Sequence, residues 1–202
     1  NLDVTKNLIE YFSSKRPDKK LILIGTSQMY KTSKKKVDLK SKFNPTNSYA
    51  KFRVAAYKCM LREKKKNNSN MTTAILFNHD SMHRKKKFLI PRLINFIKKK
   101  NFKKINEIYQ ENISADFSHA EDICNGLFKL IISKKNPNKL IFSSNKRTFI
   151  NDIINYLLKK NKINKNFIEN SINSNSTPIG DNSYTKKILS WKIKKNIFIA
   201  AN

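Results

Sequence analysis

Residues 21–30 read Leu21-Ile22-Leu23-Ile24-Gly25-Thr26-Ser27-Gln28-Met29-Tyr30, an unbroken apolar run that ends in a group of polar side chains. A short apolar run bounded by turn residues is typical of a strand buried in a parallel sheet. A connection rich in Pro and Asn follows, and Tyr49 then opens a helical pattern. This layout places the Thr26 hydroxyl at the end of a strand and a tyrosine at the start of the next helix.

Apolar runs and amphipathic segments alternate along the rest of the chain. We expect strands at 20–25, 71–77 and 139–143, an extended segment at 105–113, and helices at 2–14, 48–64, 87–99, 119–133, 149–160 and 181–191. Strands that alternate with helices are most simply joined as parallel strands with helical crossovers. The sequence therefore predicts an α/β fold with a parallel sheet.

Basic residues dominate the composition: 43 Lys and Arg against 14 Asp and Glu give a formal net charge of +29. Only six of the 43 are Arg, the residue whose forked guanidinium reads phosphate and guanine most specifically. The 37 lysines are spread along the whole chain and accompany abundant Asn and Ile, as an AT-rich coding sequence would give. We therefore expect no nucleic-acid partner, although the positive field would attract an anionic substrate or cofactor.

The sequence carries no window of about 18 consecutive apolar residues, so we expect no membrane-spanning helix and no membrane partner. The N-terminal residues contain no Met and no basic, apolar leader, so we expect a cytoplasmic protein. Cys59 and Cys124 lie apart in apolar helical contexts, which favours reduced thiols over a disulfide. His79 and His83 lie near Asp80 but follow a strand rather than share a helix face, so we expect no metal site.

Six short motifs occur in order along the chain: Thr26-Ser27-Gln28-Met29-Tyr30; Phe43-Asn44-Pro45 with Tyr49; Leu76-Phe77-Asn78-His79-Asp80-Ser81; Arg84; Asp116-Phe117-Ser118-His119-Ala120-Glu121-Asp122; and Gly180-Asp181-Asn182 with Leu189-Ser190-Trp191-Lys192. They resemble motifs of the extended short-chain dehydrogenase/reductase family, and most closely those of its GDP-mannose 4,6-dehydratases. The third motif, similar to Leu-Phe-Asn-His-Glu-Ser, is the most specific to that subgroup.

The resemblance implies the C-terminal half of a Rossmann-type parallel sheet plus a small α/β substrate-binding domain. Residues 1–79 and 114–145 would form the second half of the NADP-binding domain, and residues 80–113 and 146–202 the nucleotide-sugar domain. The family's Gly-x-x-Gly-x-x-Gly phosphate loop has no counterpart among the only three glycines. We therefore expect the C-terminal part of a longer, homo-oligomeric enzyme, preceded by about 80–120 residues that carry this loop.

The resemblance also implies a lyase that uses NADP to dehydrate GDP-mannose to GDP-4-keto-6-deoxymannose. It assigns catalysis to Thr26, Gln28, Tyr49 and Arg53, cofactor contacts to Tyr49, Arg53, His79 and Arg84, and substrate contacts to Asn78 and Thr26. In that family the tyrosine takes the proton of the sugar C4 hydroxyl, the threonine hydrogen-bonds the developing carbonyl, and a glutamate removes the C5 proton. A phenol titrates at about pH 10 in water, so a cation must stabilise the phenolate at neutral pH.

Three departures from the family pattern change what the site can do. Gln28 stands in place of the glutamate, and an amide cannot accept the C5 proton. Arg53 stands in place of a lysine, with the same charge but a larger forked group, and Ala115 replaces an arginine expected to contact the substrate phosphate. Two alternatives therefore stay open. One is a sugar-nucleotide 4-reductase or epimerase of the same family, and the other is a non-catalytic basic binding protein on an enzyme scaffold.

Overall fold

A three-stranded parallel sheet forms the centre of the computed structural model, which describes residues 2–31, 35–169 and 175–201. The strands lie in the order β1 (Leu21–Thr26), β2 (Met71–Leu76) and β6 (Lys139–Phe142). β1 pairs with β2 in parallel along its whole length, and β2 pairs in the same way with β6. The carboxyl ends of all three strands therefore lie at one edge of the sheet, and the predicted parallel α/β fold is confirmed.

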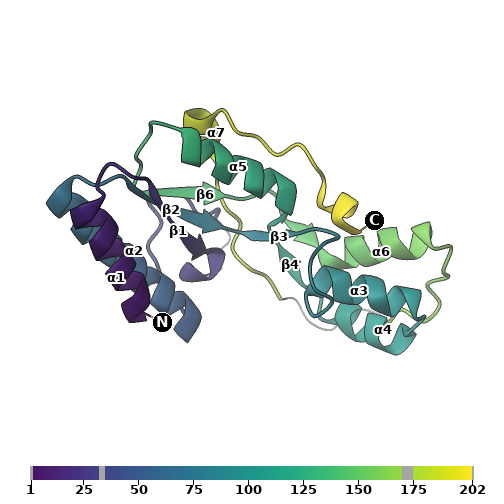
Figure 1. Ribbon diagram of the computed structural model, residues 1–202. Helices are drawn as coiled ribbons and strands as arrows, with labels where there is room; N and C mark the ends of the chain where they lie inside the picture. The colour runs from purple at the N-terminus through teal and green to yellow at the C-terminus, as the bar shows by residue number, and fades with distance from the viewer. Residues whose placement is uncertain (1, 32–34, 170–174, 202) are drawn as a thin grey trace.

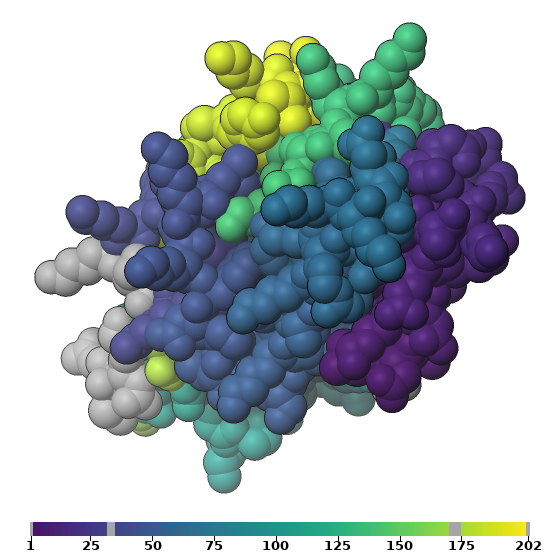
Figure 2. All heavy atoms as spheres, turned by 90° about the vertical axis from the view of Figure 1, so that its left-hand side faces the viewer, coloured from purple at the N-terminus to yellow at the C-terminus, as the bar shows by residue number. Residues whose placement is uncertain are grey.

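Helices cover both faces of this sheet (Figure 1). One face carries α1 (Leu2–Lys15) and α2 (Ser48–Asn67), which also form much of the surface in Figure 2, and the other carries α5 (Ala120–Ile132) and α7 (Ser183–Leu189). Successive strand residues point to opposite faces. Ile75 and Ile141 therefore join the apolar cluster under α1 and α2, whereas Leu140 and Phe142 join the cluster under α5 and α7.

A second body of helices lies beyond the carboxyl edge of the sheet (Figure 1). It consists of α3 (Leu89–Lys98), α4 (Phe102–Gln110), α6 (Ile150–Lys160) and the short helix η2 (Ile197–Ala201), which enclose a third apolar cluster. Two short ladders join it to the sheet: β3 (Asn78–Asp80) pairs with β5 (Phe117–His119), and β4 (Ser114–Ala115) pairs with β7 (Thr148–Phe149). Among the described residues, none of the helices has the length and apolarity needed to cross a bilayer.

The prediction of an extended segment at 105–113 is wrong. Most of it belongs to the helix α4, whose buried Ile105 and Ile108 pack into the third apolar cluster. Asn101 begins this helix, because its side chain accepts a hydrogen bond from the backbone N–H of Lys104 at 3.2 Å. The two isoleucines are three residues apart, a spacing that fits one face of a helix and does not fit the two-residue alternation of a strand. The other predicted strands and helices are confirmed, with ends that differ by at most three residues.

Helix α5 approaches the sheet closely because it carries Gly126. A Cβ at this position would lie 2.6 Å from Cε1 of Phe142 and 2.9 Å from Nε1 of Trp191. The two aromatic rings pack edge to face with their centroids 5.3 Å apart, and the Trp191 indole donates a hydrogen bond to the carbonyl of Asp122 at 2.8 Å. The rings are fixed from both sides, so a larger side chain in place of Gly126 has no room.

The amino end of the sheet is closed by a lysine of α2. Lys64 Nζ donates hydrogen bonds to the carbonyls of Met71 at 2.7 Å, Asn136 at 2.8 Å and Pro137 at 3.3 Å. Burial lowers the pKa of Lys64 to about 8, and the positive charge of Lys20 acts in the same direction. The folded protein therefore holds this proton less tightly than the unfolded chain does.

We predict that replacing Gly126 with valine lowers the free energy of unfolding by about 1–3 kcal/mol, because the added methyl groups overpack a fixed aromatic pair. Asn125→Val is the matched control, since it introduces the same residue at an exposed position of the same helix and should change stability by about 0.5 kcal/mol or less. Urea titrations of both variants measure the difference. If the two variants had the same free energy of unfolding, α5 could move away from the sheet without a loss of stability.

We predict that the stability contributed by Lys64 rises between about pH 8 and pH 10.5. The folded-state pKa is depressed, so the contribution is complete above the unfolded value of 10.5 and is lost as the pH falls through about 8. The difference in unfolding free energy between wild type and Lys64→Met should therefore increase across this window. The control is Lys58→Met, which removes an exposed lysine of the same helix, and the pH dependence of Lys64→Met is measured against it.

Candidate active site

The turn after β1 brings the first group of predicted site residues to the carboxyl edge of the sheet. Thr26 ends β1 and caps the short helix η1 (Ser27–Met29), with its Oγ1 accepting from the N–H of Gln28 at 3.4 Å. Ser27 and Met29 are buried, which anchors the turn and leaves Gln28 exposed between them. The turn therefore presents one hydroxyl and one amide side chain at the end of the strand.

A hydrogen bond joins this turn to the start of α2. Asn47 caps α2, since its Oδ1 accepts from the N–H of Ala50 at 2.8 Å. Its Nδ2 donates to Oε1 of Gln28 at 2.9 Å. The side chain of Gln28 is therefore held against the helix that begins with Ser48 and Tyr49. It supplies hydrogen-bonding groups and no carboxylate.

Tyr49 and Arg53 lie one helical turn apart on the same face of α2. The Cζ atom of Arg53 lies 5.1 Å from the centroid of the Tyr49 ring and 5.3 Å from that of Phe52. Tyr49 is 49% exposed. In the described part of the chain, Nε of Arg53 is buried without a hydrogen-bond partner. A buried donor without a partner, beside an exposed phenol, is suited to bind a group that the chain itself does not supply.

The second group of predicted site residues follows β2 at the same edge of the sheet. Thr26 is in register with Leu76, and Asn78 begins β3 two residues further along. The ring of His79 is oriented by a contact of 2.9 Å between its Nδ1 and the carbonyl oxygen of Phe77. Because β3 continues from β2 almost directly, this group lies close to the end of the strand that pairs with the one carrying Thr26.

Arg84 folds back over β3 and is held by three neighbours. Its guanidinium lies 3.8 Å from the centroid of the Phe88 ring, donates to the carbonyl of His79, and is 3.9 Å from the carboxylate of Asp80. Burial raises the pKa of Asp80, whereas the N–H of Ser81 at 2.8 Å and the charge of Arg84 act against this shift. The guanidinium is therefore fixed in direction by an aromatic ring and a buried carboxyl group.

A pocket of about 210 Å³ lies beside this arginine. Its lining includes Asn78, Arg84, Phe88, Ala115 and Phe117. Ala115 contributes no polar group to the wall, so Arg84 supplies the fixed positive charge there. An amide, a guanidinium and two aromatic rings around one space are suited to a ligand that combines an anionic group with a planar ring.

The structure therefore gathers the predicted residues into two groups. The first consists of Thr26, Gln28, Tyr49 and Arg53, and the second of Asn78, His79 and Arg84. The lining of the pocket beside Arg84 contains no member of the first group. Their roles in catalysis and binding stay predictions. Among the described residues, no cluster of three or more His, Cys, Asp or Glu side chains is arranged to hold a metal ion.

Sequence reasoning missed Asn47 and the role of Asp116. An Asn directly before a helical pattern is a recognised capping signal, so Asn47 could have been found. Asp116 is fully buried and accepts hydrogen bonds from the N–H and Oγ of Ser144, both at 2.6 Å, and from the N–H groups of Asn145 at 3.2 Å and Gly180 at 3.1 Å. Burial raises its pKa, and these hydrogen bonds oppose the shift. Its partners lie far away in the sequence, so no local pattern reveals them.

Residues 1–197 of the chain match the family model described as GDP-mannose 4,6 dehydratase. No curated protein sequence matches the chain. The fold is similar to that of dTDP-glucose 4,6-dehydratase from Bacillus anthracis str. Ames in complex with NAD, with a TM-score of 0.81 and 15% identity over 98% of this chain and 63% of that one. It is also similar to UDP-glucuronic acid 4-epimerase from Bacillus cereus in complex with UDP-glucuronic acid and NAD (TM-score 0.82, 18% identity, 100% and 64% covered).

A third similar structure is RMD from Pseudomonas aeruginosa complexed with NADPH, with a TM-score of 0.80 and 16% identity over 98% of this chain and 69% of that one. At these identities the likeness establishes a Rossmann-like α/β fold. The chain spans less than two thirds of the length of the dehydratase and the epimerase.

We predict that the two hydrogen bonds of Asn47 can be separated by substitution. Asn47→Ala removes both the helix cap and the bond to Gln28, and should lower the free energy of unfolding by about 1 kcal/mol. Asn47→Asp keeps the capping oxygen and loses only the donor to Gln28, so its stability should stay within a few tenths of a kcal/mol of wild type. Chemical denaturation distinguishes the two variants. Equal losses would mean that the link to Gln28, rather than the cap, stabilises the start of α2.

Proposed function

Since the chain belongs to the family of GDP-mannose 4,6 dehydratases, we propose that its protein is an NADP-dependent lyase that converts GDP-mannose to GDP-4-keto-6-deoxymannose. The observation that carries the proposal is the pair Tyr49 and Arg53, an exposed phenol beside a guanidinium with a free donor, on the helix tied to the Thr26 turn. Such a pair suits proton transfer at a sugar hydroxyl. A homo-oligomeric state and a cytoplasmic location belong to the same proposal.

Three residues of the first group, Thr26, Tyr49 and Arg53, have roles in this reaction that follow from their chemistry. The oxygen of Tyr49 takes the proton of the sugar C4 hydroxyl, with the guanidinium of Arg53 beside its ring. Thr26 donates its hydroxyl proton to the C4 oxygen as this becomes a carbonyl. The polar turn at the end of β1 thus faces the reacting carbon, and the helix α2 provides the base.

The residues present fit a nicotinamide dinucleotide at one end only. The buried Nε of Arg53 lacks a partner and can donate to a ribose hydroxyl beside Tyr49. The guanidinium of Arg84 and the ring of His79 would contact the same cofactor further along the edge of the sheet. The three glycines form no phosphate loop within these 202 residues, so the chain itself leaves the diphosphate of the cofactor without a cradle. When bound, the nicotinamide would accept the C4 hydride and later return it.

The pocket beside Arg84 would receive the nucleotide part of the substrate. The Asn78 amide suits a diphosphate, and the rings of Phe88 and Phe117 suit a planar base. A volume of about 210 Å³ is smaller than the roughly 300–1,000 Å³ of a typical ligand site, so this pocket would hold part of the nucleotide sugar. The sugar would then extend toward Thr26 and Tyr49.

Gln28 favours a second candidate function. Its amide is fixed by Asn47 and offers no carboxylate to remove the C5 proton, which is the step that separates dehydration from simple oxidation at C4. A sugar-nucleotide 4-reductase or epimerase needs Tyr49 and Thr26 but not this carboxylate. The reaction would then be hydride and proton transfer at C4 without the loss of water.

We predict that Gln28→Glu, in the protein expressed from its full reading frame, raises the rate of GDP-mannose dehydration by about 100-fold or more, because it restores a base at C5. Mass spectrometry of the product, which is lighter by one water, measures this rate in the presence of NADP. Gln28→Ala is the control, since it frees Asn47 without supplying a base and should give no gain. Tyr49→Phe should abolish turnover in either background.

Two outcomes would contradict the dehydratase proposal. If Gln28→Glu gives no gain while the wild type reduces or epimerises a 4-keto nucleotide sugar, the second candidate function holds. If Tyr49→Phe changes neither reaction and NADP does not bind, the scaffold is not catalytic through these residues.

A further inference from the structure

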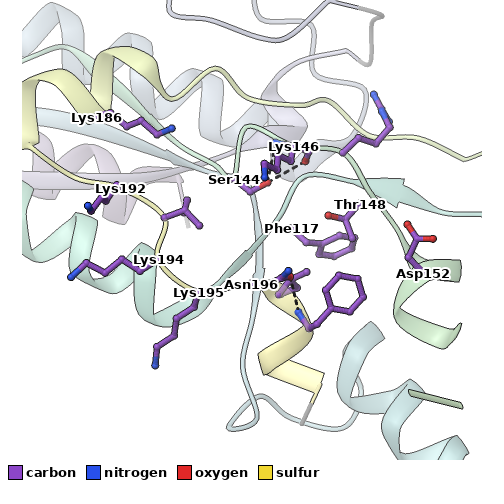
Figure 3. Close-up of a pocket in the computed structure, with 14 residues that line it drawn as sticks. Phe117, Ser144, Lys146, Thr148, Asp152, Lys186, Lys192, Lys194, Lys195 and Asn196 are labelled. Atoms are coloured by element: carbon purple, nitrogen blue, oxygen red, sulfur yellow. Dashed lines mark hydrogen bonds between the residues drawn. The ribbon is translucent and has the colours of Figure 1, made fainter. Parts of the chain in front are cut away.

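A second cavity, of about 470 Å³, lies where five segments of the chain meet (Figure 3). Its lining comes from the turn after β6, the start of α6, the C-terminal residues 192–198, Phe117 of β5 and Lys186 of α7. This cavity shares Phe117 with the pocket beside Arg84, and none of its other lining residues is assigned above to catalysis, cofactor or substrate. It is therefore a separate site with its own lining.

The lining of this cavity is strongly basic. It contains six cationic side chains and a single carboxylate, that of Asp152. Figure 3 shows Lys186, Lys192, Lys194 and Lys195 on one side of the cavity, and Phe117, Thr148 and Asp152 on the opposite side. Four of the six cations thus lie on one side of the space, and the ring of Phe117 lies on the other.

Most of these cations are not neutralised by the protein. Lys195 pairs with Glu121, and Arg147 donates to Oγ of Ser114 at 2.9 Å. By contrast, the ammonium groups of Lys146, Lys186, Lys192 and Lys194 make no hydrogen bond or ion pair with any other described residue. Lys186 is partly buried, so part of its hydration is lost as well. Cations that surround a partly enclosed space repel one another, and an anion in that space removes the repulsion.

Two buried carboxylates hold the walls of the cavity in place. Asp116 accepts from the N–H and Oγ of Ser144, which fixes the turn after β6. Asp122 accepts from the N–H groups of Lys194 at 3.0 Å and Lys195 at 2.8 Å, which fixes the C-terminal segment against α5. These bonds set the backbone next to Lys146 and at Lys194 and Lys195 before any ligand arrives, and a preorganised site spends less free energy on ordering.

We propose that this cavity binds a small phosphorylated molecule, with its phosphoryl group among Lys186, Lys192 and Lys146 and its organic part against Phe117 and Phe198. The volume falls within the range of about 300–1,000 Å³ that is usual for small-molecule sites. The combination of a cationic end with an aromatic end matches a phosphate ester better than inorganic phosphate. A partly enclosed space of this size favours a small molecule over a polymer, which a flat basic surface would bind better.

The probe for the test is phenyl phosphate, titrated calorimetrically at low salt into the protein expressed from its full reading frame. The double variant Lys186→Gln/Lys192→Gln should weaken binding by about 10-fold or more, since it removes two charged hydrogen-bond donors. The control Lys58→Gln/Lys103→Gln changes the net charge equally at exposed positions of α2 and α4 outside the cavity, and should alter affinity by less than about 2-fold. Lys186→Arg, which keeps the charge, should bind nearly as wild type does.

Several outcomes overturn the proposal. Equal losses in the two double variants would mean that phenyl phosphate responds only to the overall positive field. If inorganic phosphate binds as tightly as phenyl phosphate, the aromatic side chains contribute nothing to binding and the proposed site is wrong. A single-stranded oligonucleotide that binds more tightly and depends on the same two lysines would identify a nucleic-acid surface instead. Circular dichroism and gel filtration establish that each variant is folded before its affinity is compared.

Discussion

The buried carboxylate of Asp116 is the constraint on which the arrangement of the two bodies depends. It lies at the junction of the short ladders and accepts hydrogen bonds from the turn after β6 and from Gly180. A buried carboxylate at this position is tolerated because all of these hydrogen bonds are donated to it. The loss of one donor would leave the Asp116 carboxylate partly unpaired. One side chain thereby fixes where the central sheet ends, where the second body begins and how the C-terminal region returns to the sheet.

The candidate active site uses the edge that this arrangement leaves open. Thr26 ends β1 and Asn78 follows its parallel neighbour β2, so both residues lie at the same edge of the sheet. α2 then brings Tyr49 and Arg53 to that edge because Asn47 binds both the helix and Gln28. In the proposed function, this edge would carry out acid and base transfer at a hydroxyl, and Gln28 would decide whether the reaction extends to an elimination.

Sequence reasoning located the features that depend on local spacing. The position of Thr26 after an apolar run, and the separation of four residues between Tyr49 and Arg53, were readable because a strand and a helix each fix where the next side chain points. It failed at residues 105–113, where a short apolar segment fits two periods. It also could not find the bonds of Asp116 or the basic cavity, whose walls come from segments that only the folded chain brings together. Those features depend on contacts between segments that are far apart in the sequence, so no local sequence pattern indicates them.

The position of β1 at the end of the three-stranded sheet has a consequence for how the molecule can grow. In the described part of the chain β1 pairs only with β2, so the backbone groups along its other side form no ladder, and Ile24 is 38% exposed. A row of such groups is a template for another parallel strand. A parallel strand that pairs with this side of β1 places its own carboxyl end next to Thr26. Such a strand therefore extends the sheet and also adds a wall to the candidate site.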